Sequence, residues 1–358
     1  MSDECYLNLR KFLDRFPLGF PETPSGVEIE ILKRLFTEEE ARTAIYLTPT
    51  PETATRIARR NKLNEKELEV KLESMSKKGL IFRIRREGKT LYNSAPFMIG
   101  LYEYSVKKID KDLAKLFKEY YDIAYLDEMG MSNVPGFKIV PIEETIETDT
   151  VLYPYQMLKE SIRDSRVISV AECICRKETR LNEEGCNHPI ENCLSFGIAA
   201  EYYIENGMGR EITADEAIKI VEEADESGLV HASSNSKHLS NICNCCPDCC
   251  ASMKGMTKFG HDKQKYMNAI FESIINIEAC IGCGLCVDRC PVKAITLDDY
   301  AEVNRDLCLG CGLCARVCSE EAIFLKPRED RVEPFNRVHE MGMAIIKGKR
   351  KNSPEIDN

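Results

Sequence analysis

Eight cysteines near the carboxyl end of this 358-residue chain repeat one spacing twice. The first run is Cys280-x2-Cys283-x2-Cys286-x3-Cys290, and the second is Cys308-x2-Cys311-x2-Cys314-x3-Cys318. In bacterial-type iron–sulfur runs of this spacing, three cysteines on a tight loop bind three irons of a cube, and the fourth binds the partner cluster. Zinc sites built from Cys-x2-Cys usually separate their half-sites by about a dozen residues or more. The spacing therefore predicts two [4Fe–4S] clusters rather than zinc sites or a disulfide scaffold.

The fourth cysteine of each run is predicted to bind the cluster of the other run, because it points away from its own loop. The predicted ligands of the first cluster are Cys280, Cys283, Cys286 and Cys318. Those of the second cluster are Cys308, Cys311, Cys314 and Cys290. Glycines between the cysteines fit this assignment, since a chain wrapped around a cluster needs positive φ values and small side chains. They are Gly282, Gly284, Gly310 and Gly312.

Residues 271–328, which contain both runs, resemble the two-cluster ferredoxins. One difference is Ser319, which follows Cys318 where that family usually has a proline. A serine can cap the turn that follows, so Cys318 is retained as a ligand. The resemblance implies two [4Fe–4S] clusters and single-electron exchange with redox partner proteins, one a donor and one an acceptor.

The chain has a formal net charge of −10 and contains 18 cysteines. Its first residues lack a basic segment followed by an apolar run, and no stretch of about eighteen apolar residues occurs, so we expect neither a signal peptide nor a membrane span. We therefore expect a cytoplasmic protein, whose clustered cysteines bind metal in a reducing compartment. Because an acidic surface repels nucleic acid on average, any DNA binding would have to be local.

The region 20–95 is predicted to form helices followed by a hairpin. Apolar residues at helical spacing from Gly26 to Phe36 indicate one helix, and a capping box from Thr37 to Glu40 starts the next. Two short helices are expected at 52–60 and 64–78, and a hairpin at 80–92. This order of helices and a basic hairpin resembles the winged helix-turn-helix of bacterial and archaeal regulators.

The part of this region from Pro51 to Tyr92 is basic, with twelve Lys and Arg residues against six Asp and Glu residues. Basic side chains on the hairpin would lie against DNA phosphates, as in other winged modules. They are Arg83, Arg85, Arg86 and Lys89. Against DNA binding, the helix that would enter the groove begins with Glu65, Glu67 and Glu69. The two alternatives are DNA binding and a protein-docking or dimerisation role.

Residues 96–165 are predicted to form a helical connector, with an amphipathic helix from about Leu101 to Tyr125. The stretch from Met129 to Pro141 contains proline and glycine and is expected to mark a domain boundary. Further along, a helix is expected from Thr213 to Ser227, with acidic residues in its first turn. Residues 329–358 would form a carboxyl-terminal tail.

A second group of cysteines lies in the predicted cysteine-rich domain 166–255. Its nine members are Cys173, Cys175, Cys186, Cys193, Cys243, Cys245, Cys246, Cys249 and Cys250. We expect a strand from Arg166 to Cys175, with Cys173 and Cys175 on one face, and a helix that begins at Cys193 and runs through Tyr203. Free thiols on a short polar loop would be oxidised, so these residues are candidate metal ligands. The alternatives are a third [4Fe–4S] cluster, a zinc site, and a redox-active thiol or disulfide site or an unusual cluster held by adjacent cysteines.

The sequence as a whole predicts an α+β, multi-domain chain with a winged-helix-like module, a cysteine-rich middle domain and a two-cluster ferredoxin domain. This combination resembles ferredoxin-domain proteins of anaerobic bacteria and archaea, which implies iron–sulfur clusters and anaerobic electron transfer. Glycine-rich nucleotide fingerprints and catalytic acid–base pairs are not recognisable in the sequence. The favoured function is single-electron transfer, alone or as part of a larger oxidoreductase. The alternative is a redox-responsive DNA-binding regulator.

Overall fold

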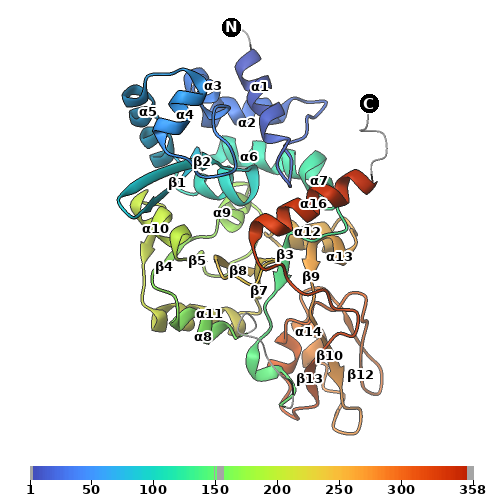
Figure 1. Ribbon diagram of the computed structural model, residues 1–358. Coiled ribbons are helices and arrows are strands. Elements are labelled where there is room, and N and C mark those ends of the chain that lie inside the picture. The colour runs from blue at the N-terminus through green and yellow to red at the C-terminus, as the bar shows by residue number, and fades with distance from the viewer. Residues whose placement is uncertain (1–2, 149, 151–156, 353–358) are drawn as a thin grey trace.

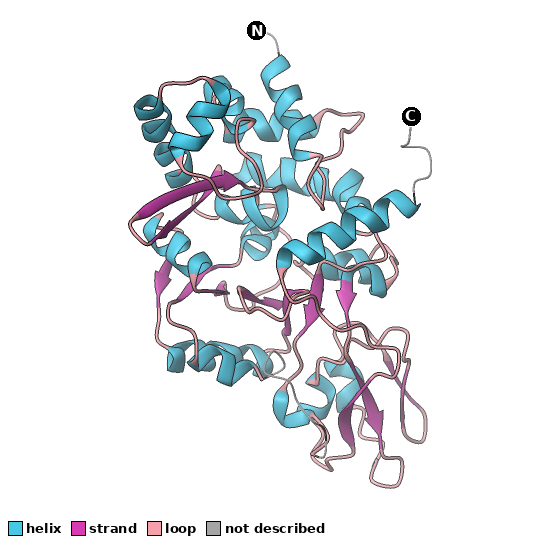
Figure 2. Ribbon diagram, viewed as in Figure 1, coloured by secondary structure: helices cyan, strands magenta, loops and turns pink. Residues whose placement is uncertain are grey.

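The computed structural model describes residues 3–148, 150 and 157–352 (Figure 1). Residues 149 and 151–156 of the predicted connector, and 353–358 of the predicted tail, lie outside this description. Figure 1 shows a helical lobe at the amino end, a sheet across the middle, and a smaller lobe that carries the repeated cysteine runs. Strands are concentrated in the middle and in the small lobe, whereas helices dominate the amino-terminal lobe (Figure 2). The chain therefore mixes helix and strand in the way expected of an α+β protein.

The amino-terminal lobe consists of five helices and a hairpin. They are α1 (Glu4–Leu13), α2 (Val27–Leu35), α3 (Glu38–Ala44), α4 (Ala54–Asn61), α5 (Glu65–Lys77), β1 (Ile81–Arg86) and β2 (Lys89–Ser94). The predicted capping box is confirmed: the Thr37 hydroxyl accepts from the Glu40 N–H, and the Glu40 carboxylate accepts from the Thr37 N–H. Local sequence signals thus determine where these helices begin.

The hairpin is attached to the middle of the chain rather than projecting freely. Arg83 is buried and pairs with Glu73 at 2.6 Å and with Glu205 of α10 (Ile198–Glu205) at 2.5 Å. The Tyr202 hydroxyl, also on α10, donates to the carbonyl oxygen of Ile81 at 2.7 Å. Arg85 binds the same two glutamates. Two of the four basic hairpin side chains therefore pair with glutamates elsewhere in the chain.

The prediction of a single long helix between Leu101 and Tyr125 is wrong. The segment begins with an irregular turn, η1 (Phe97–Leu101), in which Met98, Ile99 and Gly100 have non-helical backbone angles. It continues with a 3-10 turn η2 (Glu103–Ser105), the helix α6 (Lys111–Tyr120), a π-helical turn η3 (Tyr121–Tyr125) and the helix α7 (Leu126–Met129). A new helix starts at Lys111 because the Asp110 side chain accepts from the Leu113 N–H at 2.9 Å and acts as its N-cap. Aromatic side chains of this segment, such as Phe97 and Tyr120, pack together in the core.

A seven-stranded sheet forms the middle of the molecule. Its strands are β3 (Phe137–Ile139), β4 (Ile168–Glu172), β5 (Glu191–Phe196), β6 (Gly209–Glu211), β7 (Val230–Ser234), β8 (Asn241–Cys245) and β9 (Met267–Asn268). Their order is β6-β4-β5-β8-β7-β3-β9, with antiparallel neighbours except for the parallel pair β3 and β9. The stretch expected to be a domain boundary therefore supplies a strand, β3, to this sheet.

The two faces of the sheet have different neighbours. Leu194 and Ile242, paired between β5 and β8, belong to the apolar cluster that packs α8 (Leu158–Arg163) and α11 (Ala214–Glu226) on one face. Side chains alternate along a strand, so Cys193 and Cys243 point to the opposite face, toward the amino-terminal lobe. The predicted α11 is confirmed, and the Thr213 hydroxyl caps it by accepting from the Glu216 N–H.

Two predictions about the middle cysteines are wrong. Cys193 lies in strand β5 rather than at the start of a helix, because β5 pairs with β4 and β8 on its two sides. Strand β4 ends at Glu172, so Cys173 and Cys175 do not share a strand face. Instead Cys173 precedes the helix α9 (Ile174–Leu181), and Cys175 lies in its first turn.

The small lobe contains two similar halves. Its elements are β10 (Phe271–Ile275), α14 (Leu285–Arg289), β11 (Ile295–Leu297), β12 (Ala301–Val303), α15 (Leu313–Arg316) and β13 (Ile323–Pro327). The outer strands β10 and β13 pair antiparallel, as do β11 and β12. Each cysteine run leads into a short helix, which contains Cys286 in α14 and Cys314 in α15. The two halves thus repeat the same order of cysteine loop, short helix and strand.

The remaining elements connect these parts. They are η4 (Glu143–Thr145), α12 (Ala251–Thr257), α13 (Lys263–Tyr266) and α16 (Val338–Asn352). The helix α16, in the predicted tail, returns to the amino-terminal lobe, where Lys349 pairs with the buried Glu128 (Figure 1). Among the described residues, every helix is too short or too polar to span a lipid bilayer.

Candidate iron–sulfur and thiol sites

A small cavity in the carboxyl-terminal lobe is lined by one predicted ligand set. Its walls include the thiols of Cys280, Cys283, Cys286 and Cys318. Cys318, the last cysteine of the second run, therefore lies beside the three cysteines of the first run. Apolar side chains, among them Ile281, Leu285 and Leu297, complete the cavity wall. Cys283 is exposed, so this cavity lies near the surface.

The other predicted set gathers deeper in the lobe. Burial raises the pKa of Cys290, and the neighbouring Cys308 thiolate raises it further. Burial likewise raises the pKa of Cys314 to about 12, with Cys308 and Cys290 adding to the effect and a hydrogen bond from Ser273 opposing it. The Cys311 pKa is also raised by burial and then by Cys314, Cys308 and Cys290. The fourth cysteine of the first run thus faces the three of the second.

The backbone of this lobe suits a cluster that carries negative charge. The amides of Ala294, Ala322 and Gly310 point at cysteine sulfurs, at 3.2 Å from Cys290, 3.3 Å from Cys318 and 3.4 Å from Cys308. Such N–H groups stabilise thiolates and tune the reduction potential of the iron they bind. Gly310 has a φ of +64°, and a Cβ atom there would collide with the Phe271 carbonyl group. The residues present therefore fit [4Fe–4S] clusters.

Residues 273–325 match the family model of a 4Fe-4S dicluster domain. This part of the chain is a ferredoxin-type domain that carries [4Fe–4S] clusters and has an iron–sulfur electron-transfer role. We refer to it as the ferredoxin domain.

Two curated proteins are similar in sequence to short segments of the ferredoxin domain. A ferredoxin-type protein NapF of Haemophilus influenzae is 48% identical over 33 residues, which are 9% of this chain and 19% of that protein. A probable ferredoxin of Methanosarcina thermophila is 56% identical over 25 residues, 7% of this chain and 43% of that protein. The chain thus spans less than half the length of either relative. No solved structure matches.

The cysteines of the middle region converge around one cavity of about 390 Å³. Eight of the nine candidate ligands line it: Cys173, Cys175, Cys193, Cys243, Cys245, Cys246, Cys249 and Cys250. They come from the start of α9, the strands β5 and β8, and the loop before α12. The ninth, Cys186, lies in a loop behind Cys246 and Cys249. The structure therefore brings together residues from nearly the whole length of the predicted domain, from Cys173 to Cys250.

Six of these thiols form a ring of neighbours. Each interacts electrostatically with the next in the order Cys173, Cys175, Cys250, Cys245, Cys243 and Cys193, and Cys193 in turn interacts with Cys173. Shared protons with Cys193 and Cys245 hold the pKa of Cys243 well below its usual value. Cys173 and Cys250 also have lowered pKa values, whereas burial and proton sharing raise the pKa of Cys175, Cys193 and Cys245. Thiolates are the metal-binding form of cysteine, and three of the six thiols favour that form.

Glu103 lines the same cavity and was missed by sequence reasoning. Burial raises its pKa to about 8, although its carboxylate accepts the Gly100 N–H at 2.7 Å. The group therefore carries a proton at neutral pH and can supply it inside the cavity. Nothing in the local sequence indicates this position, because the cavity is formed by strands that come much later in the chain.

Proposed function

We propose that this chain passes single electrons between two [4Fe–4S] clusters in the ferredoxin domain and a third cluster held by the six-thiol ring. The ligand sets would be those predicted from the spacing of the two cysteine runs. A cluster suits the ring better than a single zinc ion, whose bonds to sulfur of about 2.3 Å require sulfurs close together. A cavity of about 390 Å³ bordered by the ring offers space for a larger inorganic core.

The observation that carries the proposal is a chain of bonded groups between the two regions. The Ile142 N–H donates to the Cys311 carbonyl oxygen at 3.1 Å, and the Val140 N–H donates to the His231 carbonyl oxygen at 2.9 Å. The His231 ring lies 2.7 Å from the Asn244 side-chain oxygen. Asn244 stands between Cys243 and Cys245 in β8. Consecutive covalent and hydrogen bonds thus join the predicted second cluster to the thiol ring.

The burial of the two predicted clusters suggests the direction of exchange. Cys308 and Cys314 are buried beside the middle region, whereas Cys283 of the first set is exposed. Ile281 and Leu285, 65% and 52% exposed, surround Cys283 and offer apolar contact area to another protein. We infer that an external redox partner exchanges electrons at the first cluster, and that the second cluster relays them inward.

Freeze-quench electron paramagnetic resonance would test this relay. The protein is mixed with less than one equivalent of a photoreduced donor, and the spectra of the ferredoxin and middle centres are followed in time. We expect the middle centre to be reduced in a fast phase that Cys314→Ser abolishes, because that variant loses the second cluster. Cys5→Ser, on α1 and far from every candidate ligand, is the matched control. Equal rates in all three proteins would contradict the relay.

The DNA-binding alternative has less support. Arg83 and Arg85, which were expected to face phosphates, are bound to Glu73 and Glu205. These contacts favour a docking role for the hairpin, in which it attaches the amino-terminal lobe to α10. The lobe would then cover the thiol ring, since Phe82 and Asn93 of the hairpin line the same cavity.

A further inference from the structure

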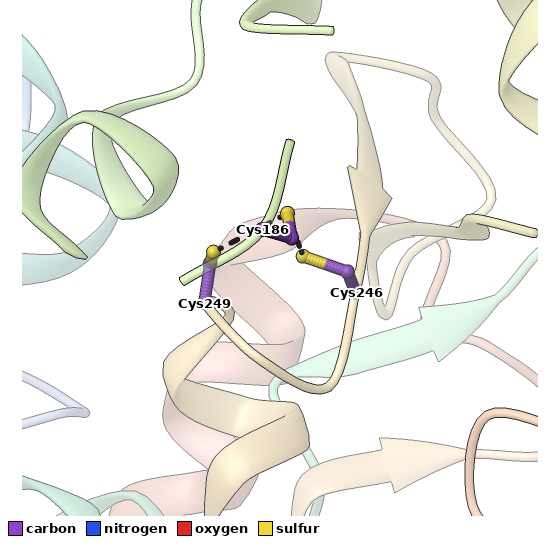
Figure 3. Close-up of side chains that lie close together, drawn as sticks. All are labelled: Cys186, Cys246 and Cys249. Carbon is purple, nitrogen blue, oxygen red and sulfur yellow. Dashed lines mark hydrogen bonds between the residues drawn. The ribbon is translucent and has the colours of Figure 1, made fainter. Parts of the chain in front are cut away.

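We propose that Cys186, Cys246 and Cys249 form a separate mononuclear site in the middle region, which binds a soft divalent cation of the zinc type. This site would be distinct from the cluster in the six-thiol ring. Figure 3 shows the three thiols pointing toward one another from two loops. Cys186 comes from the loop after α9, and the other two come from the loop between β8 and α12.

The distances between the sulfurs favour one ion. The Cys186 sulfur lies 3.4 Å from that of Cys246 and 3.6 Å from that of Cys249, and all three lie within 4.8 Å. A tetrahedral zinc ion with bonds of about 2.3 Å places its sulfurs about 3.8 Å apart. Thiolates on a cube bind different irons and must stand further apart. Within the described residues, the ferredoxin cysteines form no trio this close.

The sequence and the loop backbone support the same conclusion. Cys246-Pro247-Asp248-Cys249 is a Cys-x2-Cys half-site, and Cys186 supplies a third thiol from a distant loop, as structural zinc sites commonly do. The Arg180 guanidinium donates to the Cys186 carbonyl oxygen at 3.0 Å and to the His188 carbonyl oxygen at 2.6 Å. The third thiol is therefore positioned before any metal arrives.

A buried arginine offsets the charge of this site. Three thiolates and a divalent cation carry a net charge of −1, which is costly in the interior unless a cation lies nearby. Arg176 is 1% exposed, and its guanidinium lies between Cys173 of the ring and Cys246 and Cys186 of the trio. Two of its nitrogens donate to the carbonyl oxygens of Pro189 and Asn244, whereas its Nε has no hydrogen-bond partner within the described residues. Arg176 thus neutralises the site without competing for the metal.

The site explains why cysteines occur in adjacent pairs. In Cys245-Cys246 and in Cys249-Cys250, one member belongs to the trio and the other to the ring, where Cys245 and Cys250 are neighbours. An ion bound by Cys246 and Cys249 would fix the loop between them.

Metal analysis and zinc-edge X-ray absorption on the anaerobically purified chain test the proposal. We expect about one zinc per chain with sulfur neighbours at about 2.3 Å. Cys186→Ser should remove most of the zinc and leave the iron content unchanged, whereas Cys245→Ser, next to the trio but in the ring, should lower iron and keep zinc. Zinc with oxygen and nitrogen neighbours only would mean an adventitious ion and overturn the proposal. A loss of iron in Cys186→Ser would overturn it as well. If that variant fails to fold, the zinc-edge absorption of the wild-type protein decides whether its zinc has sulfur neighbours.

Discussion

Replacing Cys290 with serine should remove the cluster of the second cysteine run, although Cys290 belongs to the first run in sequence. The variant is expected to lose about four irons, and its reduced spectrum should match that of Cys314→Ser rather than that of Cys286→Ser. Iron and sulfide analysis together with electron paramagnetic resonance of the three variants would measure this. The effect is large because a cube with one missing thiolate is open to solvent and oxidation.

The physical reason is the position of Cys290 at the end of α14. The neighbouring charges that raise its pKa come from Cys308, whereas those near Cys286 come from Cys283 and Cys280. The Ala294 N–H, which donates to the Cys290 sulfur, also holds the side chain in this orientation. If Cys290→Ser and Cys286→Ser gave the same spectrum, Cys290 would bind the cluster of its own run, and the predicted exchange would be wrong.

Replacing Cys245 with serine should remove the middle cluster and spare the ferredoxin domain. Cys245 is buried between two other ring thiols, Cys243 and Cys250, so its loss interrupts the ring. We expect iron to fall by about four per chain while about eight remain. Iron analysis and the spectrum of the remaining clusters would measure the change.

The matched control for this variant is Cys5→Ser, which removes a buried thiol on α1 that takes no part in either thiol group. Its iron content should equal that of the wild type. Two outcomes would contradict the assignment of the ring. One is a Cys245→Ser protein that retains all of its iron, and the other is a variant whose ferredoxin spectrum is lost together with the middle signal.

Features with local causes could be predicted from the sequence. The capping box at Thr37 and the N-cap at Thr213 start helices where expected, because both depend on contacts within one turn. The spacing of the two cysteine runs is also local, and the segment that contains them matches a 4Fe-4S dicluster model. The presence of iron–sulfur clusters at this end of the chain could therefore be predicted from the sequence alone.

Features that depend on distant pairing could not be predicted. Cys193 was expected to begin a helix, but β5 exists because β4 and β8 hydrogen-bond to its two edges, and β8 lies far along the chain. The same pairing places Cys193 beside Cys243. The division of nine cysteines into a ring and a trio likewise follows from how the loop before α12 turns. No local pattern indicated which member of each adjacent pair would face which group.

Buried charged residues were hidden from sequence reasoning for the same reason. Arg176 follows Cys175 directly in sequence, yet it is fully buried and faces Cys246, in a loop that comes much later. Arg83 was expected to face DNA, but Glu205 of α10 binds it instead. In both cases the partner that decides the role of the arginine lies far away in the sequence.

The central claim is that clusters in the ferredoxin domain exchange electrons with a further cluster in the same chain. An anaerobic reductive titration of the whole protein, with iron and sulfide analysis on the same sample, tests it most directly. The account predicts about twelve irons per chain and three paramagnetic centres, the third of which appears only with the thiol ring intact. About eight irons and two centres, unchanged by Cys245→Ser, would contradict it.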